Sequence, residues 1–99
     1  MKTKVLIIDD EPSIARSLTR VLEERGYSVQ SASTGKAGVA QVADWRPQIV
    51  LLDLKLPDAD GLDLLPKIRH IESPVQVIVL TAYADTKAAV QALKKGAAD

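Results

Sequence analysis

The chain has no cysteine, and aromatic residues make up only 3% of it. The absence of cysteine excludes a disulfide framework, a thiolate metal site and a cysteine nucleophile. Because aromatic side chains are so few, the 46% of residues that are hydrophobic must build an aliphatic core. A chain of 99 residues suffices for one small domain, since at this size roughly 60–70% of the unfolded surface can be buried.

An excess of charge of one sign and a long hydrophobic run are also lacking. The 13 basic and 13 acidic side chains balance, so the domain has no bulk attraction for nucleic acid or for an anionic membrane. No stretch approaches the roughly 18 apolar residues of a membrane span. The apolar run after the first four residues is too short for a signal peptide. We therefore expect a cytoplasmic domain that binds neither nucleic acid nor membrane.

Three short apolar runs predict buried β-strands: Val5–Ile8, Ile49–Leu52 and Val75–Leu80. They are rich in β-branched residues and nearly continuous, which is typical of parallel strands covered on both faces. A fourth segment, Ser28–Ala32, alternates between polar and apolar residues and is expected to be an edge strand.

Between these runs the apolar residues recur at helical spacing. The positions concerned are Ile14, Leu18, Val21 and Leu22; Ala37 and Ala40; Leu62, Leu65 and Ile68; and Ala89, Val90 and Leu93. Pro12 suits the first turn of the first helix and Gly26 its end, while the fourth helix is expected over Asp85–Lys95.

Strands and helices therefore alternate, which predicts an α/β fold with a doubly wound parallel sheet of the flavodoxin-like kind. We count four βα units over residues 1–99, all in one domain. A further strand is expected after the fourth helix, where the sequence stops. Without it, Val75–Leu80 becomes an apolar edge strand, which favours dimer formation or strand swapping.

Acids and a hydroxyl stand where the predicted strands end. Asp9 and Asp10 follow the first strand, Asp53 ends the third, and Thr81 follows the fourth. Ligands of open α/β sheets bind at the carboxyl ends of the strands, so these residues are expected to converge. Each alone is also explained as a turn or helix-start residue, and that explanation is adequate for Asp58, Asp60 and Asp63.

Convergence of three carboxylates requires something to offset their repulsion. Two carboxylates about 4 Å apart repel by roughly 4 kcal/mol at an effective dielectric constant of 20. Oxygen ligands without histidine or cysteine favour a hard cation, Mg²⁺ before Zn²⁺. The pattern therefore indicates a metal-assisted phosphoryl site with a carboxylate nucleophile.

Four segments together resemble the receiver domain of two-component response regulators. They are VLIIDDEPS, IVLLDLKLPDADGLDLL, VIVLTAYAD and ALKKGAAD, and the resemblance extends over essentially the whole chain. It implies that Asp53 accepts a phosphoryl group from the phosphohistidine of a sensor histidine kinase or phosphotransfer protein. It also implies that Asp9, Asp10, Asp53 and the backbone carbonyl of Lys55 hold Mg²⁺.

The same resemblance assigns the remaining roles. Thr81 bonds the phosphoryl group and moves on activation, and the small Ala82 leaves access beside it. The family's lysine at the end of a fifth strand, with that strand and the last helix, is expected beyond Asp99, so the receiver domain is interpreted as incomplete at its C-terminus. The implied function is a bacterial signalling switch that acts on an output domain, with transcription regulation favoured, and not an enzyme beyond its own phosphorylation and dephosphorylation.

Three alternatives stay open. A haloacid-dehalogenase-type phosphatase also uses a strand-end aspartate with Mg²⁺, but it needs a second aspartate at the position of Lys55. A nucleotide or flavin binder needs a Ser/Thr/Gly-rich loop after the first strand, where this chain has DDE. A receiver that only binds a protein partner, without phosphorylation, is disfavoured by the intact acidic set.

Overall fold

The computed structural model describes residues 2–71 and 74–80. In this part of the chain strands and helices alternate as predicted. The elements are β1 (Lys4–Ile8), α1 (Pro12–Glu24), β2 (Ser28–Ala32), α2 (Gly35–Trp45), β3 (Ile49–Asp53), α3 (Gly61–Ile71) and β4 (Gln76–Leu80). The four predicted strands are confirmed to within one residue at each end. The helix expected over Asp85–Lys95 lies outside the described residues.

The four strands form one parallel sheet in the order β2-β1-β3-β4. The chain thus steps from β1 outward to β2 and then crosses back to β3, as in the doubly wound flavodoxin-like fold. The predicted fold class is confirmed, and β2 lies at an edge as its alternating sequence suggested. β4 is the other edge strand among the residues that the structure describes.

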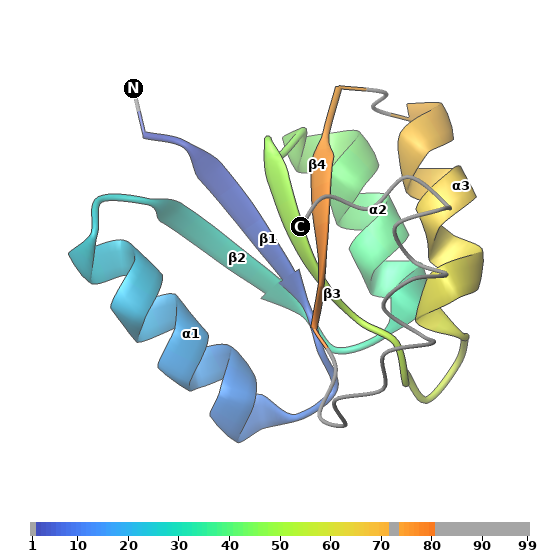
Figure 1. Ribbon diagram of the computed structural model, residues 1–99, viewed down its shortest axis with the longest axis horizontal. Helices are drawn as coiled ribbons and strands as arrows, with labels where there is room; N and C mark the ends of the chain where they lie inside the picture. The colour runs from blue at the N-terminus through green and yellow to red at the C-terminus, as the bar shows by residue number, and fades with distance from the viewer. Residues whose placement is uncertain (1, 72–73, 81–99) are drawn as a thin grey trace.

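Helices cover the two faces of the sheet unequally (Figure 1). α2 and α3 lie on one face, where Leu6, Ile8 and Leu52 are completely buried against them. α1 lies on the opposite face, over Val5 and Ile7. Neighbouring residues of one strand point to opposite faces, so near-continuous apolar strands are needed to serve both layers.

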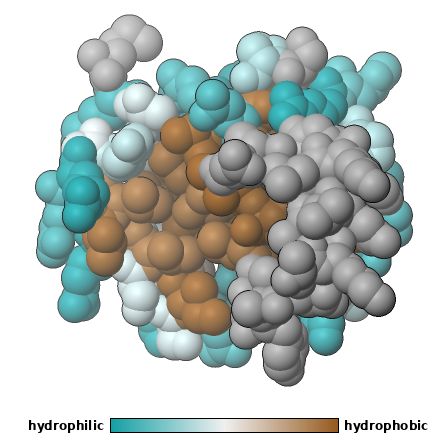
Figure 2. All heavy atoms as spheres, viewed as in Figure 1, coloured by the Kyte–Doolittle hydropathy of each residue, from teal (hydrophilic) through white to brown (hydrophobic). Residues whose placement is uncertain are grey.

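The face that carries α1 keeps apolar surface exposed in the described part of the chain. Figure 2 shows hydrophobic residues gathered over the centre of the sheet on this side. Ile14 and Val21, two of the apolar residues at helical spacing in α1, are 41% and 48% exposed. Leu18 and Leu22 do pack on the sheet. The helix is present as the spacing predicted, but the sheet covers only part of its apolar side.

Within residues 2–71 and 74–80, no helix is both long enough and apolar enough to cross a membrane.

Candidate phosphoryl and metal site

The candidate site lies at the carboxyl edge of the sheet, where β1 and β3 are neighbours. Ile8 pairs with Leu52 in the parallel register, so the next residues, Asp9 and Asp53, leave adjacent strands side by side. Strands in a sheet are about 4.8 Å apart, which brings these two carboxylates close although 44 positions separate them in sequence. Asp10 follows directly, before α1 begins at Pro12.

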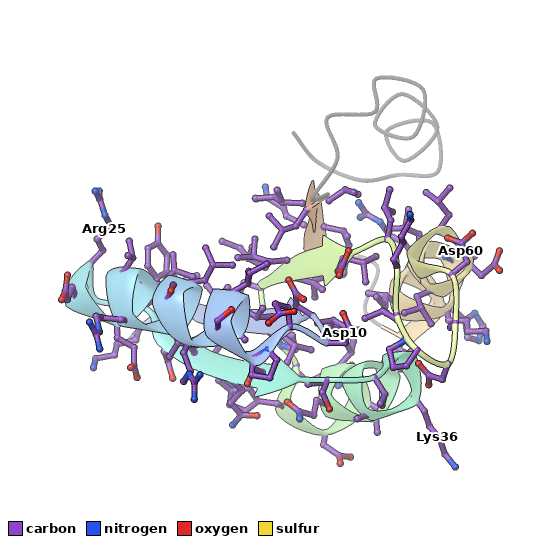
Figure 3. All side chains as sticks on the ribbon, turned by 90° about the horizontal axis from the view of Figure 1, so that it is seen from below. Asp10, Arg25, Lys36 and Asp60 are labelled. Carbon is purple, nitrogen blue, oxygen red and sulfur yellow. The ribbon has the colours of Figure 1, made fainter. Side chains whose placement is uncertain are left out.

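The three acids converge as the sequence predicted. One carboxylate oxygen from each of Asp9, Asp10 and Asp53 lies within 4.8 Å of the others. Asp9 is buried with 6% of its surface exposed, Asp53 is half-buried, and Asp10 is exposed. Figure 3 shows the molecule from the end at which Asp10 lies. The cluster is therefore anchored in the protein at Asp9 and open to solvent at Asp10.

The environment of Asp9 changes the pKa of its carboxyl group. Burial raises the pKa of its carboxyl group, and the charges of Asp53 and Asp10 raise it further. The backbone N–H of Glu11 donates a 2.8 Å hydrogen bond to Asp9 Oδ1, which acts in the opposite direction but does not cancel the rise in pKa. The charged form of Asp9 is disfavoured at this position, and a nearby cation would stabilise it.

Removing the charge of Asp9 is expected to stabilise the metal-free protein. The folded-state pKa lies above the unfolded value, so the destabilisation is absent below the unfolded pKa and develops as the pH rises through the folded pKa. In EDTA at neutral pH, Asp9→Asn should melt at a higher temperature than the wild type, and the difference should vanish in acid. Its amide oxygen can still accept the Glu11 N–H.

The melting temperatures with excess Mg²⁺ provide the control. Binding of a cation to the folded state alone should raise the melting temperature of the wild type more than that of Asp9→Asn. If Asp9→Asn melts lower than the wild type in EDTA at neutral pH, the charge of Asp9 does not destabilise the metal-free fold.

The loop of residues 54–60, which we call the acceptor loop, returns from Asp53 to the start of α3. The backbone N–H of Lys55 donates a 3.2 Å hydrogen bond to Asp53 Oδ1. Asp60 Oδ1 accepts the N–H of Leu62 at 3.0 Å and so starts α3, as expected. Gly61 packs against the backbone of Asp53 so closely that a Cβ atom would contact the Asp53 carbonyl oxygen. The loop thus contacts Asp53 at both ends, its side chain at Lys55 and its backbone at Gly61.

The donor set fits a hard cation. It consists of carboxylate oxygens from three residues, and the pKa of Asp9 is raised first by its burial and then by the charges of Asp53 and Asp10. The Lys55 carbonyl, which the resemblance implies as a fourth ligand, stays a prediction; the structure places the N–H of Lys55 on Asp53 Oδ1. Mg²⁺ is commonly bound by one or two carboxylates with several positions left to water and phosphate oxygens.

The other predicted residues are not members of this cluster as the described residues define it. Thr81 and Ala82 lie outside the described residues. Asp58, interpreted from the sequence as a turn residue, binds the first N–H groups of α2 instead, at Gly35 and Lys36. No signal in the sequence could have shown this contact, because 23 residues separate Asp58 from Gly35 and the loop path decides it.

A flavodoxin-like sheet with three carboxylates at its carboxyl edge defines an α/β protein with an acidic site whose oxygen atoms suit a cation. The chain belongs to the response regulator receiver domain family, whose match covers residues 5–99. Response regulators receive a phosphoryl group from histidine kinases and act through output domains. Receiver domains are generally not catalytic enzymes. The family generally uses Mg²⁺ at its acidic pocket.

Individual relatives agree with this assignment. The transcriptional regulatory protein KdpE of Mycobacterium tuberculosis is 48% identical over 98 residues, which are 98% of this chain and 42% of KdpE. A CheY-like receiver domain from Methanospirillum hungatei superimposes with a TM-score of 0.91 at 34% identity, over 98% of this chain and 78% of that one.

A response regulator from Burkholderia pseudomallei, solved with a phosphorylated aspartic acid and a calcium ion, has a TM-score of 0.90 at 33% identity. The match covers 97% of this chain and 56% of that one. The chain spans about a fifth to a half of the length of the first curated relatives that it matches.

Proposed function

We propose that this chain is a single receiver domain that works as a phosphorylation-activated switch, with Asp53 as the phosphoryl acceptor. The observation that carries the proposal is the convergence of Asp9, Asp10 and Asp53 at the sheet edge. Of the three, Asp53 is the one that ends a central strand and is still half-exposed, so a donor can reach it. The phosphorylated aspartic acid recorded in the Burkholderia relative supports this chemistry.

In the proposed reaction a carboxylate oxygen of Asp53 attacks the phosphorus of a phosphohistidine. The new O–P bond forms as the N–P bond breaks, and the histidine nitrogen leaves with the electron pair and takes up a proton. Asp9, Asp10, Asp53 and the Lys55 carbonyl would hold Mg²⁺. When bound, the ion offsets negative charge on the transferring group. The Lys55 N–H holds one Asp53 oxygen, which orients the carboxylate for attack.

The response to phosphorylation is proposed to involve Thr81, which would bond the phosphoryl oxygens, with Ala82 leaving room beside it. The added charge of about −1.5 to −2, taken from phosphorylated hydroxyl side chains, is large enough to bias a two-state loop. The donor would be a sensor histidine kinase or a phosphotransfer protein in the cytoplasm. The output is proposed to be transcription regulation, since relatives such as KdpE are named transcriptional regulators.

Two other functions are less well supported. The exposed side chain at position 55 is lysine, so the acid/base aspartate of a haloacid-dehalogenase-type phosphatase is lacking. A receiver that binds a partner without phosphorylation would not need a buried, electrostatically unfavourable Asp9.

Dimer formation or strand exchange through β4 remains part of the proposal, since β4 pairs only with β3 in the described residues.

Mass spectrometry with a small phosphodonor tests the proposal. Incubation with acetyl phosphate and Mg²⁺ should add one phosphoryl group to the intact protein, and peptide mapping should locate it on Asp53. EDTA should prevent the addition, because the carboxylates alone repel the donor. A folded sample that takes up no phosphoryl group in the presence of Mg²⁺ would exclude the switch function.

A further inference from the structure

The acceptor loop is a small closed hairpin with Asp58 at its tip. Lys55 and Asp60 form an antiparallel bridge, and the Leu56 N–H donates to the Ala59 carbonyl at 3.3 Å. At the base, the Gly61 N–H donates to the Leu54 carbonyl at 2.8 Å. These contacts link the two arms of the loop, so the tip and Lys55 belong to one hydrogen-bonded unit.

The tip is attached to the start of α2. Asp58 Oδ1 accepts the N–H of Gly35 at 2.7 Å, and Oδ2 accepts the N–H of Lys36 at 2.9 Å. The first N–H groups of a helix have no partner within the helix, so these two donors are available. These two hydrogen bonds, that of Lys36 first, lower the pKa of Asp58, so the carboxylate is charged at neutral pH. Figure 3 shows Lys36 and Asp60 on the two sides of this junction.

The helix also has an N-cap residue of its own. Thr34 is the N-cap residue of α2, and its hydroxyl accepts the N–H of Ala37 at 3.0 Å. Gly35 is buried, and a Cβ atom there would lie only 3.0 Å from Leu64 Cδ1 and 3.3 Å from Asp58 Oδ1. The close approach of loop and helix thus depends on glycine at this position. Thr34 and Asp58 bind different N–H groups, so the contact of Asp58 attaches the loop to the helix.

We propose that Asp58 is a positioning residue of the metal site, which tethers the acceptor loop to α2 and thereby fixes the Lys55 peptide beside Asp53. The inference rests on the proposed function, in which the Lys55 carbonyl is a metal ligand. Lys55 also holds Asp53 through its own N–H, which belongs to the peptide that precedes this carbonyl. Leu56 and Ala59 pack against the core and hold the middle of the loop, whereas Asp58 is exposed and fixes the tip by polar contacts alone.

A backbone ligand has to stay within about 0.5 Å of its productive position. Groups that orient metal ligands typically change metal affinity by about 10–100-fold when they are removed. Asp58 acts through the hairpin and not on the ligand directly, so we expect the lower end of this range. Asp58→Ala should weaken Mg²⁺ binding about tenfold. Asp58→Asn, which keeps one oxygen acceptor, should weaken it less.

Mg²⁺ titrations followed by NMR amide shifts, without any phosphodonor, measure this effect. Asp44→Ala is the matched control, since it removes an equal charge from an exposed position on α2 and should leave the dissociation constant unchanged. Titrations in about 0.1 M and about 1 M KCl separate geometry from charge, because the Debye length falls from about 10 to about 3 Å. Amide hydrogen exchange of Leu56 and Gly61 should become faster in Asp58→Ala.

The possible results separate the tether proposed for Asp58 from the function proposed for the whole site. A tenfold loss that persists at high salt, with faster exchange in the loop, supports the tether. Equal affinity of folded Asp58→Ala and wild type overturns it, as does a loss that high salt abolishes or that Asp44→Ala reproduces. If Asp58→Ala does not fold, the same comparison is made with Asp58→Asn. If the wild type itself binds no Mg²⁺, the proposed function fails and the tether with it.

Discussion

Asp53→Asn is expected to abolish phosphoryl incorporation from acetyl phosphate. The substitution keeps the shape of the side chain, but an amide is not a nucleophile comparable with a carboxylate. It also removes one of three carboxylates whose oxygens lie within 4.8 Å, so Mg²⁺ affinity should fall as well. Intact-protein mass spectrometry should show no phosphorylated species under conditions that label the wild type fully.

Two comparisons make the result specific to Asp53. Asp63→Asn alters an exposed acid in the first turn of α3 and should be labelled like the wild type. The folded state of Asp53→Asn is checked by its melting temperature in EDTA, which should not fall, because a charge is removed from a repulsive cluster. Labelling that persists in Asp53→Asn would move the acceptor to another acid, with exposed Asp10 the first to be examined.

Most of the fold could be predicted because its determinants are local in sequence. The short β-branched runs are buried on both faces, as in Leu51 and Leu52, and each is followed by residues that end a strand. The acidic cluster could be predicted for the same reason: parallel strands place their carboxyl ends at one edge. Knowing that Asp9 and Asp53 each leave such a strand was enough to bring them together.

Features that depend on the tertiary path could not be predicted in this way. Helical spacing placed Ile14 and Val21 on an apolar side, but it does not tell how wide a stripe the sheet covers. The attachment of Asp58 to α2 joins a loop to the start of a helix, and the two segments have no common sequence pattern. In both cases the missing information is which surfaces face each other, and this is decided by packing and not by the residues of one element.

Gly61 is the first residue of α3 and packs against the backbone of Asp53. Gly61→Ala is therefore expected to lower the stability of the fold and to disturb the site. A Cβ atom at this position would contact the Asp53 carbonyl oxygen and lie 2.7 Å from Leu54 Cα. Both are backbone atoms, which cannot move aside by changing a rotamer. We expect a loss in the free energy of unfolding at the upper end of the about 1–3 kcal/mol that overpacking costs. In the fraction that stays folded, Asp53 should be displaced and Mg²⁺ binding weakened.

Gly38→Ala is the comparison that tests this reasoning, measured by urea unfolding and by Mg²⁺ titration of the folded samples. A Cβ atom at Gly38 would also be crowded, with Ile8 Cδ1 at 2.5 Å, Cγ1 at 2.8 Å and Cγ2 at 3.0 Å, but all three atoms belong to a side chain and not to the backbone. Alanine inside a helix gains about 1 kcal/mol over glycine, which offsets part of that crowding. Gly38→Ala should therefore cost less stability and leave Mg²⁺ affinity unchanged. Equal losses for the two variants would show that the backbone of Asp53 yields as readily as the side chain of Ile8, and that Gly61 does not fix the acceptor.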